Sequence, residues 1–124
     1  MKRSLLIMLL ALTVAIPAAL AAGGTRIALK PAKAFPAAKG SAQFKAKAGE
    51  RELQVEVEHI RRLEGKRVVF IVGGAKLGTA KVNGLGAAEI SRNSERGQRV
   101  PRVAAGTAVK VRTAGGTTIV AGSF

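Results

Sequence analysis

The feature that most constrains the fold of this chain is the alternation of apolar and polar residues in short segments after Gly40. Residues 42–47 and 53–58 alternate in this way over their whole length. Successive side chains of a β-strand point to opposite faces of a sheet, so each segment predicts a strand with one buried and one solvated face. Residues 48–51 predict the tight turn between them. Pairing through that turn places lysines opposite glutamates, which helps to select the register.

The rest of the chain continues this β pattern. Residues 68–72 are all apolar, which predicts a strand covered on both faces near the centre of the fold. Gly73-Gly74 and Asn83-Gly84 predict tight reversals, because these residues tolerate positive φ angles. The remaining predicted strands lie at 77–82, 87–91, 109–112 and 117–124. Seven or eight short strands, with no helical period, predict an all-β fold, either an antiparallel β-sandwich or a small barrel.

The first residues predict a cleavable signal peptide at 1–21. Lys2 and Arg3 form a positive start, an apolar run follows, and Ala19-Leu20-Ala21 matches the small-x-small pattern of a cleavage site. An uncleaved membrane anchor is the alternative, because the apolar stretch is near the short limit for a span. We favour the signal peptide because Pro17 and the alanine-rich end fit a cleavage region. The processed chain is expected in the periplasm or outside the cell, with no membrane span.

Two further ranges complete the predicted organisation. Residues 22–40 are rich in Ala, Pro, Lys and Gly and predict an extended lead-in, where residues 26–29 would form a short edge strand. Residues 41–124 are expected to form the β domain. The chain has no cysteine, so disulfides and lipoprotein attachment are excluded, and the fold depends on its apolar core.

The charge of the chain is strongly positive. The full sequence has 21 Lys and Arg against 7 acids, all of them glutamate. Loss of Lys2 and Arg3 with the leader leaves 19 cations against 7 acids, a formal charge of +12. Such a charge attracts polyanions of many kinds. A solubility requirement or a generally basic proteome would produce the same charge, and both interpretations stay open at this point.

The sequence contains few residues of the types that form catalytic or metal sites. A nucleophilic triad requires a base and an orienting acid, and His59 is the one histidine in a chain without Asp or Cys. His59 continues the inward side of the strand that carries Val57, which predicts a structural residue. Glu56 and Glu58 share the opposite side and would suit glycosidic acid–base chemistry, but a salt-bridged solvated face explains them more simply. We expect no enzymatic activity, no cofactor and no metal.

Basic residues are the remaining candidates for a binding site. They lie in the turn around Glu64 and in the irregular stretch 92–102, with a further lysine-rich group in the lead-in. Positive turns hold phosphate, sulfate or carboxylate groups by charge-assisted hydrogen bonds. The predicted anion-binding residues are Arg61, Arg62, Lys66, Arg67, Arg92, Arg96, Arg99 and Arg102. Nucleic acid is not the expected polyanion, because the chain has no Tyr or Trp for base stacking.

Five short motifs, in their order along the chain, resemble those of small exported bacterial all-β domains that generally carry no assigned activity. They lie at 40–44 (GSAQF), 53–58 (LQVEVE), 78–83 (GTAKVN), 97–101 (GQRVP) and 121–124 (AGSF). The first two are also similar to the opening hairpin of CHRD-like domains. The resemblance implies a β fold and no catalytic residue.

Two functions are consistent with these features. The first is an exported, non-enzymatic β domain with a structural or interaction role in the bacterial envelope or outside the cell. The second is a polyanion-binding protein that acts on envelope lipid phosphates or acidic polysaccharide through its basic loops. The expected partner is therefore a polyanionic surface or another envelope protein.

Overall fold

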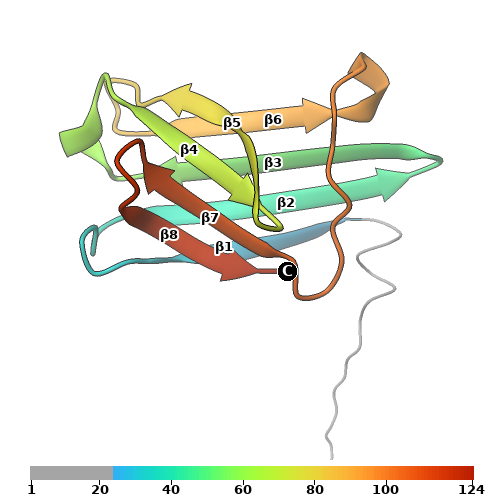
Figure 1. Cartoon of the computed structure of the whole chain (residues 1–124), viewed down its shortest axis with the longest axis horizontal. Coiled ribbons are helices and arrows are strands. Elements are labelled where there is room, and N and C mark those ends of the chain that lie inside the picture. The colour runs from blue at the N-terminus through green and yellow to red at the C-terminus, as the bar shows by residue number, and fades with distance from the viewer. Residues whose placement is uncertain (1–23) are drawn as a thin grey trace, which may run out of the picture.

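The computed structural model describes residues 24–124, so the predicted signal peptide at 1–21 lies outside the described residues. Eight strands account for most of this part of the chain, and every pair of neighbouring strands is antiparallel (Figure 1). The strands are β1 (Thr25–Pro31), β2 (Lys39–Lys47), β3 (Glu50–Glu58), β4 (Arg67–Val72), β5 (Ala75–Lys81), β6 (Ala88–Asn93), β7 (Ala108–Thr113) and β8 (Thr118–Ser123). Two short 3-10 turns, η2 (Arg61–Leu63) and η3 (Ser94–Arg96), lie in the connections. The predicted all-β antiparallel fold is confirmed.

The strands form a nearly closed barrel in the order β5-β4-β7-β8-β1-β2-β3-β6. In Figure 1 the strands β4, β7 and β8 lie in front of β1, β2 and β3. β1 links these two layers, because it pairs with β2 over residues 25–29 and with β8 at Lys30 and Pro31. The two strands at the ends of the order, β5 and β6, share no hydrogen-bonded ladder and leave one seam in the barrel. Of the two predicted architectures, the structure is therefore the barrel-like one.

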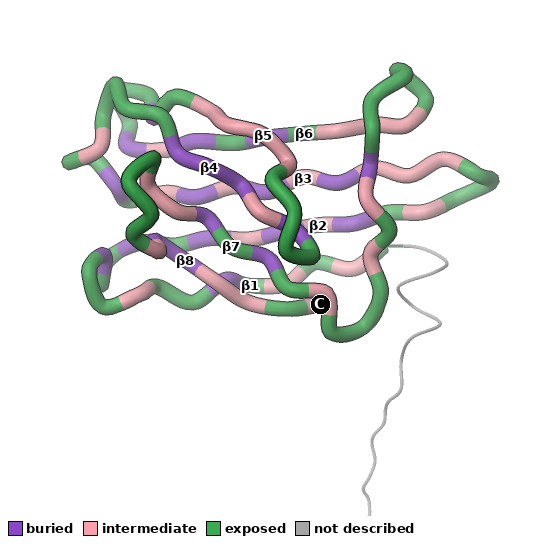
Figure 2. Tube along the Cα trace, in the orientation of Figure 1, coloured by how far each residue is buried: buried purple, intermediate pink, exposed green. Residues whose placement is uncertain are grey.

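The hydrophobic core lies between the two layers (Figure 2). Val68, Phe70 and Val72 of β4 are buried together with Val55 and Val57 of β3, each with at most 2% of its surface exposed. Val55 and Val57 occupy the inward positions of the predicted alternation, and the three β4 residues belong to the predicted apolar run. The predicted burial of these β3 and β4 residues is therefore confirmed.

The β2–β3 hairpin has the predicted register, but its turn is shorter than the predicted 48–51, because Glu50 and Arg51 already belong to β3. Ala48 and Gly49 form the turn and both have positive φ. Lys45 lies directly opposite Glu52, and Lys47 lies opposite Glu50. The lysines and glutamates face each other as expected, although the one ionic contact within 4.0 Å among residues 24–124 joins His59 to its neighbour Glu58.

The β structure begins earlier than the predicted boundary at residue 41. The segment 22–40, expected as a lead-in, contains β1, which lies between β2 and β8 rather than at an edge. Phe35 and Ala38 in the following connection are buried in the core. The prolines of this segment made its sequence look irregular. Pro31 is nevertheless compatible with β1, because it is the last residue of the strand, where a missing N–H group is tolerated.

β4 also differs from its predicted place. It lies one strand from the seam rather than at the centre of the order, yet Val69 on its outer side is only 7% exposed. Val69 pairs with Thr79 of β5 and Arg112 of β7, whose side chains share its face. The continuous apolar run therefore reflects a partly covered outer face and not a central position.

Side chains close the seam between β5 and β6. Arg92 of β6 follows the inward parity of Ile90, and its guanidinium donates to the carbonyl oxygen of Leu77 in β5 (3.4 Å) and to that of Ser91 (3.1 Å). Gly78 of β5 lies beneath them, because a Cβ there would be 2.6 Å from Ile90 Cδ1 and 2.7 Å from Arg92 Nη2. A glycine in β5 thus allows β6 to approach without a ladder.

Within residues 24–124, none of the helical segments has the length and apolarity that crossing a bilayer would require.

Candidate functional site

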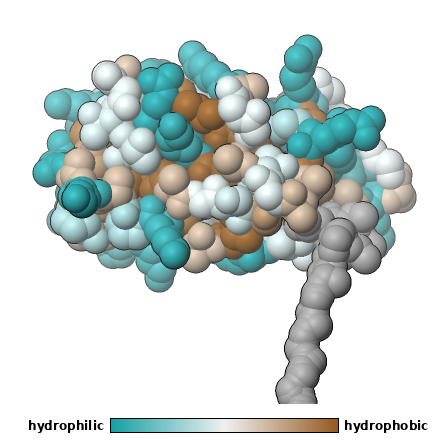
Figure 3. All heavy atoms as spheres, turned by 60° about the horizontal axis from the view of Figure 1, so that its bottom comes forward, coloured by the Kyte–Doolittle hydropathy of each residue, from teal (hydrophilic) through white to brown (hydrophobic). Residues whose placement is uncertain are grey.

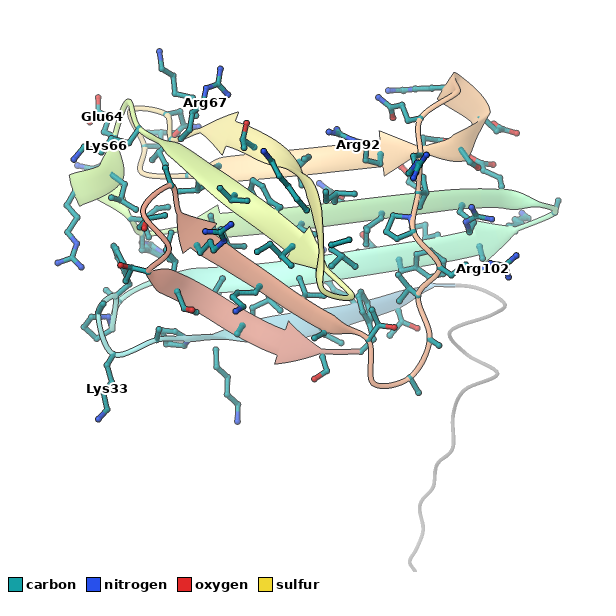
Figure 4. The ribbon with its side chains drawn as sticks, in the orientation of Figure 1. Lys33, Glu64, Lys66, Arg67, Arg92 and Arg102 are labelled. Atoms are coloured by element: carbon teal, nitrogen blue, oxygen red, sulfur yellow. The ribbon has the colours of Figure 1, made fainter. Side chains whose placement is uncertain are left out.

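The predicted anion-binding residues separate to the two ends of the barrel (Figure 4). Lys66 and Arg67 lie where β4 begins, at the end that also carries η2, whereas Arg102 lies in the long connection between β6 and β7 at the opposite end. Arg96 and Arg99 belong to that same connection, and Arg92 lies in β6, one residue before the strand ends. The two groups of arginines cannot surround one small anion.

Two of the predicted residues bind backbone oxygens of other segments of the fold. Arg62 stacks its guanidinium on the ring of Phe35, 4.1 Å from the centroid, and donates to the backbone oxygen of Ala34. Arg92 bridges the seam. Both arginines therefore stabilise the chain's own contacts, which reduces their capacity to bind an external anion.

A different set of basic residues shares one outer face of the barrel. The register places Lys30, Ala121 and Lys110 side by side on β1, β8 and β7. The same row continues through Ile71 of β4 to Lys76 of β5. Neighbouring strands are about 4.8 Å apart, so the three lysines repeat at roughly 10 Å across the sheet.

Two shorter rows extend this face towards the start of β4. Arg112 lies beside Val69 in one row, and Arg67 lies opposite Lys81 in the other. Arg67 also donates to the hydroxyl oxygen of Thr79, at 3.4 Å. We call this surface the cationic face. Its six basic residues are Lys30, Arg67, Lys76, Lys81, Lys110 and Arg112.

No acidic side chain interrupts the cationic face. Five of the seven glutamates point outward from β3 and β6 on the other layer, and the remaining two lie in connections, at Glu64 and Glu95. The five are Glu50, Glu52, Glu56, Glu58 and Glu89. We call that outer surface of β2, β3 and β6 the glutamate face. Lysines of β2 partly neutralise it, whereas nothing neutralises the cationic face.

The cationic face also has apolar positions between its charges. Val69, Ile71 and Ala121 occupy outward positions on it. Figure 3, which turns the lower side of Figure 1 forward, shows brown apolar surface between separate teal side chains. Long lysine and arginine side chains can lie along such an apolar surface and keep their charged ends in water.

A shallow hollow of about 430 Å³ lies on the outer side of β1, β2 and β3. Arg26, Lys39 and Ser41 line it together with Glu56 and Glu58. Partial burial raises the pKa of the Glu56 carboxyl above its ordinary value, and the negative charges of Glu58 and Glu89 add to the effect. The two carboxyl groups share a hollow with cations, which differs from the plain salt-bridged surface that the sequence predicted.

His59 is not where the sequence placed it. Its side chain is 63% exposed and its Nε2 lies 3.9 Å from Glu58 Oε1, on the outer side. The backbone adopts a positive φ of 64° at His59, so the strand parity ends there and Ile60 takes the buried position. Within residues 24–124, no group of three or more potential ligands is arranged to hold a metal ion.

Sequence reasoning found only Arg67 of the cationic face. The sequence predicted a strand at 109–112 but did not single out Lys110 or Arg112 as binding residues. What the sequence does not contain is the strand order, which brings β1, β8, β7, β4 and β5 together in one sheet. Loop arginines are obvious in a sequence, whereas a face assembled from five strands appears only in the fold.

Comparison with known protein families, with curated proteins and with solved structures finds no match to this chain.

Proposed function

We propose that this chain is an exported, non-enzymatic β domain that binds a polyanion through its cationic face. The observation that carries the proposal is the segregation of charge. Six cations share one sheet face without an acid, while five of the seven glutamates point outward from the other layer. A charge that served only solubility would be expected on both faces alike.

The spacing on the cationic face suits a ligand with repeated negative groups. Lys30, Lys110 and Lys76 form a line whose members are about 10 Å apart, because each is two strands from the next. Strand positions are held by the backbone ladder, so the charges are set out on a rigid base. An extended array of phosphate, sulfate or carboxylate groups matches such a line better than a single small anion.

Retention on immobilised heparin in a salt gradient tests this proposal. The variant Lys76→Gln/Lys110→Gln/Arg112→Gln removes three charges from the cationic face. A matched control, Arg96→Gln/Arg99→Gln/Arg102→Gln, removes three charges from the exposed connection between β6 and β7. Both variants have the same net charge, so a difference between them reports position rather than total charge.

The expected result is elution of the face variant at clearly lower salt than the control variant. Removal of charges that contact the polyanion weakens binding and flattens its dependence on salt. Equal elution of the two variants would mean that net charge alone retains the protein. Earlier elution of the control variant would indicate that the arginines of the β6–β7 connection bind heparin. Either outcome would overturn the cationic face as the binding surface.

A further inference from the structure

Leu85 is the one large apolar side chain that is exposed within residues 24–124, with 76% of its surface open to water. It lies in the connection between β5 and β6, at the barrel end that carries η2. Isolated exposed leucines are common on proteins and by themselves indicate nothing. The surroundings of Leu85 set it apart, because hydrogen bonds hold its loop and basic residues outnumber acids at this end of the barrel.

The loop around Leu85 is fixed by a dense set of hydrogen bonds. The side-chain oxygen of Asn83 accepts from the N–H groups of Leu85 (2.9 Å) and Ala87 (3.1 Å). The Asn83 carbonyl accepts from Gly86, and the Gly86 carbonyl accepts from Ile60, both at 3.0 Å. These bonds tie the loop to the β3–β4 connection. Leu85 is therefore presented outward and cannot fold back to bury itself.

Gly86 allows Arg61 to pack closely against the loop. Its φ is 78°, and a Cβ there would lie 2.7 Å from Arg61 Cγ and 2.9 Å from the Arg61 backbone nitrogen. The stem of Arg61 thus packs against the residue that follows Leu85. Lys66 is joined to the base of the same loop, because its carbonyl accepts from the N–H group of Val82 at 2.9 Å.

The barrel end is strongly basic around this leucine. Arg67 and Lys81 pair where β4 begins and β5 ends, next to Lys66. Glu64 is the acid nearest the loop, with its Oε2 3.6 Å from the position of a Cβ on Gly84. We call this surface the leucine end. It consists of Leu85, four basic residues and one acid, namely Arg61, Lys66, Arg67, Lys81 and Glu64.

We propose that the leucine end docks the protein on an anionic lipid surface, with Leu85 entering the boundary between headgroups and acyl chains. Such a surface offers negative headgroups above an apolar layer, which is the combination that the leucine end presents. A soluble polyanion provides no apolar phase for Leu85. A second copy docking through the same end would bring like charges together, and nucleic acid would prefer an aromatic side chain for stacking.

The inference goes beyond the proposed function and uses a neighbouring but separate surface. Lys76 and Lys110 of the cationic face lie away from the leucine end, whereas Arg67 and Lys81 lie where the two surfaces meet. A protein docked through Leu85 keeps the line of lysines on β1, β7 and β5 outside the contact. The two sites can therefore be tested by independent substitutions.

A single tryptophan at residue 85 tests the docking directly. The chain has no Trp and no Tyr, so Leu85→Trp introduces a local fluorescent reporter. Tryptophan favours the interfacial region of a bilayer. The matched control is Ala105→Trp, at an exposed position in the β6–β7 connection at the other barrel end. Both proteins are mixed with vesicles of phosphatidylglycerol and phosphatidylcholine in equal parts, with pure phosphatidylcholine vesicles, and with soluble heparin.

The expected result is a blue shift for Leu85→Trp with the anionic vesicles alone, and no shift for Ala105→Trp. In flotation with the same vesicles, Leu85→Ser should bind roughly tenfold more weakly than the parent, because one apolar side chain no longer enters the lipid. All variants share the same N-terminus, so any binding through that segment cancels in the comparison. Heparin retention of Leu85→Ser should match that of the parent.

Two results would overturn the docking inference. One is the absence of a blue shift at residue 85 with anionic vesicles, and the other is equal flotation of Leu85→Ser and the parent. Unchanged heparin retention in those cases would leave the proposed function standing. Loss of heparin retention in the cationic-face variant together with normal vesicle docking would support both surfaces as separate sites.

Discussion

The cationic face and the glutamate face are built by the same strand pattern and yet carry different chemistry. Both alternate inward apolar with outward polar residues, as Val109 with Lys110 in β7 and Val57 with Glu58 in β3 do. On the glutamate face, lysines of β2 stand opposite glutamates of β3. On the cationic face, cations stand beside valine, isoleucine, threonine and alanine, and Arg67 stands beside Lys81. Solvation explains the first arrangement, whereas the second leaves a concentrated positive field without local neutralisation.

The difference teaches that the outward positions are free to carry function because the inward positions carry the stability. Burial of apolar side chains is the main stabilising term, and exposed ion pairs contribute little. Unpaired lysines on one face therefore cost the fold little beyond mutual repulsion, which salt screens. Substitutions at inward and at outward positions should therefore have different effects on stability, and the following predictions compare them.

The largest effect is expected at the inner side of the cationic face. Phe70 is fully buried and lies between Gly78 and Val111 in register. Phe70→Ala should lower the free energy of unfolding by about 3–5 kcal/mol, because it leaves a cavity in a small core. Lys110→Gln, on the outward side of the adjacent strand, should change it by less than about 0.5 kcal/mol. Urea denaturation of both variants measures the contrast, and similar midpoints would contradict the division between the two sides.

An intermediate effect is expected at the seam. Arg92→Ala removes the donors that reach Leu77 and Ser91 and uncovers the space above Gly78. We expect a loss of about 1.5–3 kcal/mol, the range for hydrogen bonds that involve a charged group. Arg96→Ala in the exposed η3 turn is the control and should be close to neutral. If the two variants melt alike, Arg92 does not hold β5 to β6.

The smallest effect concerns pH and the glutamate face. The pKa of Glu56 is raised above 4.5, chiefly by burial and next by Glu58 and Glu89. The folded state then holds this proton more tightly than the unfolded state, so stability falls as pH rises from 4.5 through the raised pKa. Glu56→Gln should raise the melting temperature slightly at neutral pH and leave it unchanged well below pH 4.5. Glu52→Gln, on the same strand, serves as the control. A lower melting temperature for Glu56→Gln at neutral pH would contradict this assignment.

The sequence pattern predicted most of the strands and part of the core, because alternation and turn residues can be recognised from residues that are close together in the chain. It missed β1 as a shared strand, since Pro31 and Pro36 made the segment look irregular. It also misplaced His59, because its positive φ breaks the parity of β3. Most residues of the candidate site could not be predicted from the sequence. Lys30 and Lys110 are 80 positions apart in the chain, and only the order of β1, β8 and β7 brings them to one row.

Lysine acetylation, measured by mass spectrometry with and without heparin, tests the central claim most directly. The chain provides its own comparison, because Lys30, Lys76, Lys81 and Lys110 lie on the cationic face whereas Lys39, Lys45 and Lys47 point outward from β2 on the other layer. We predict that heparin protects the first group and leaves the second reactive. Equal protection of both groups, or stronger protection of the β2 lysines, would contradict a binding surface on the cationic face.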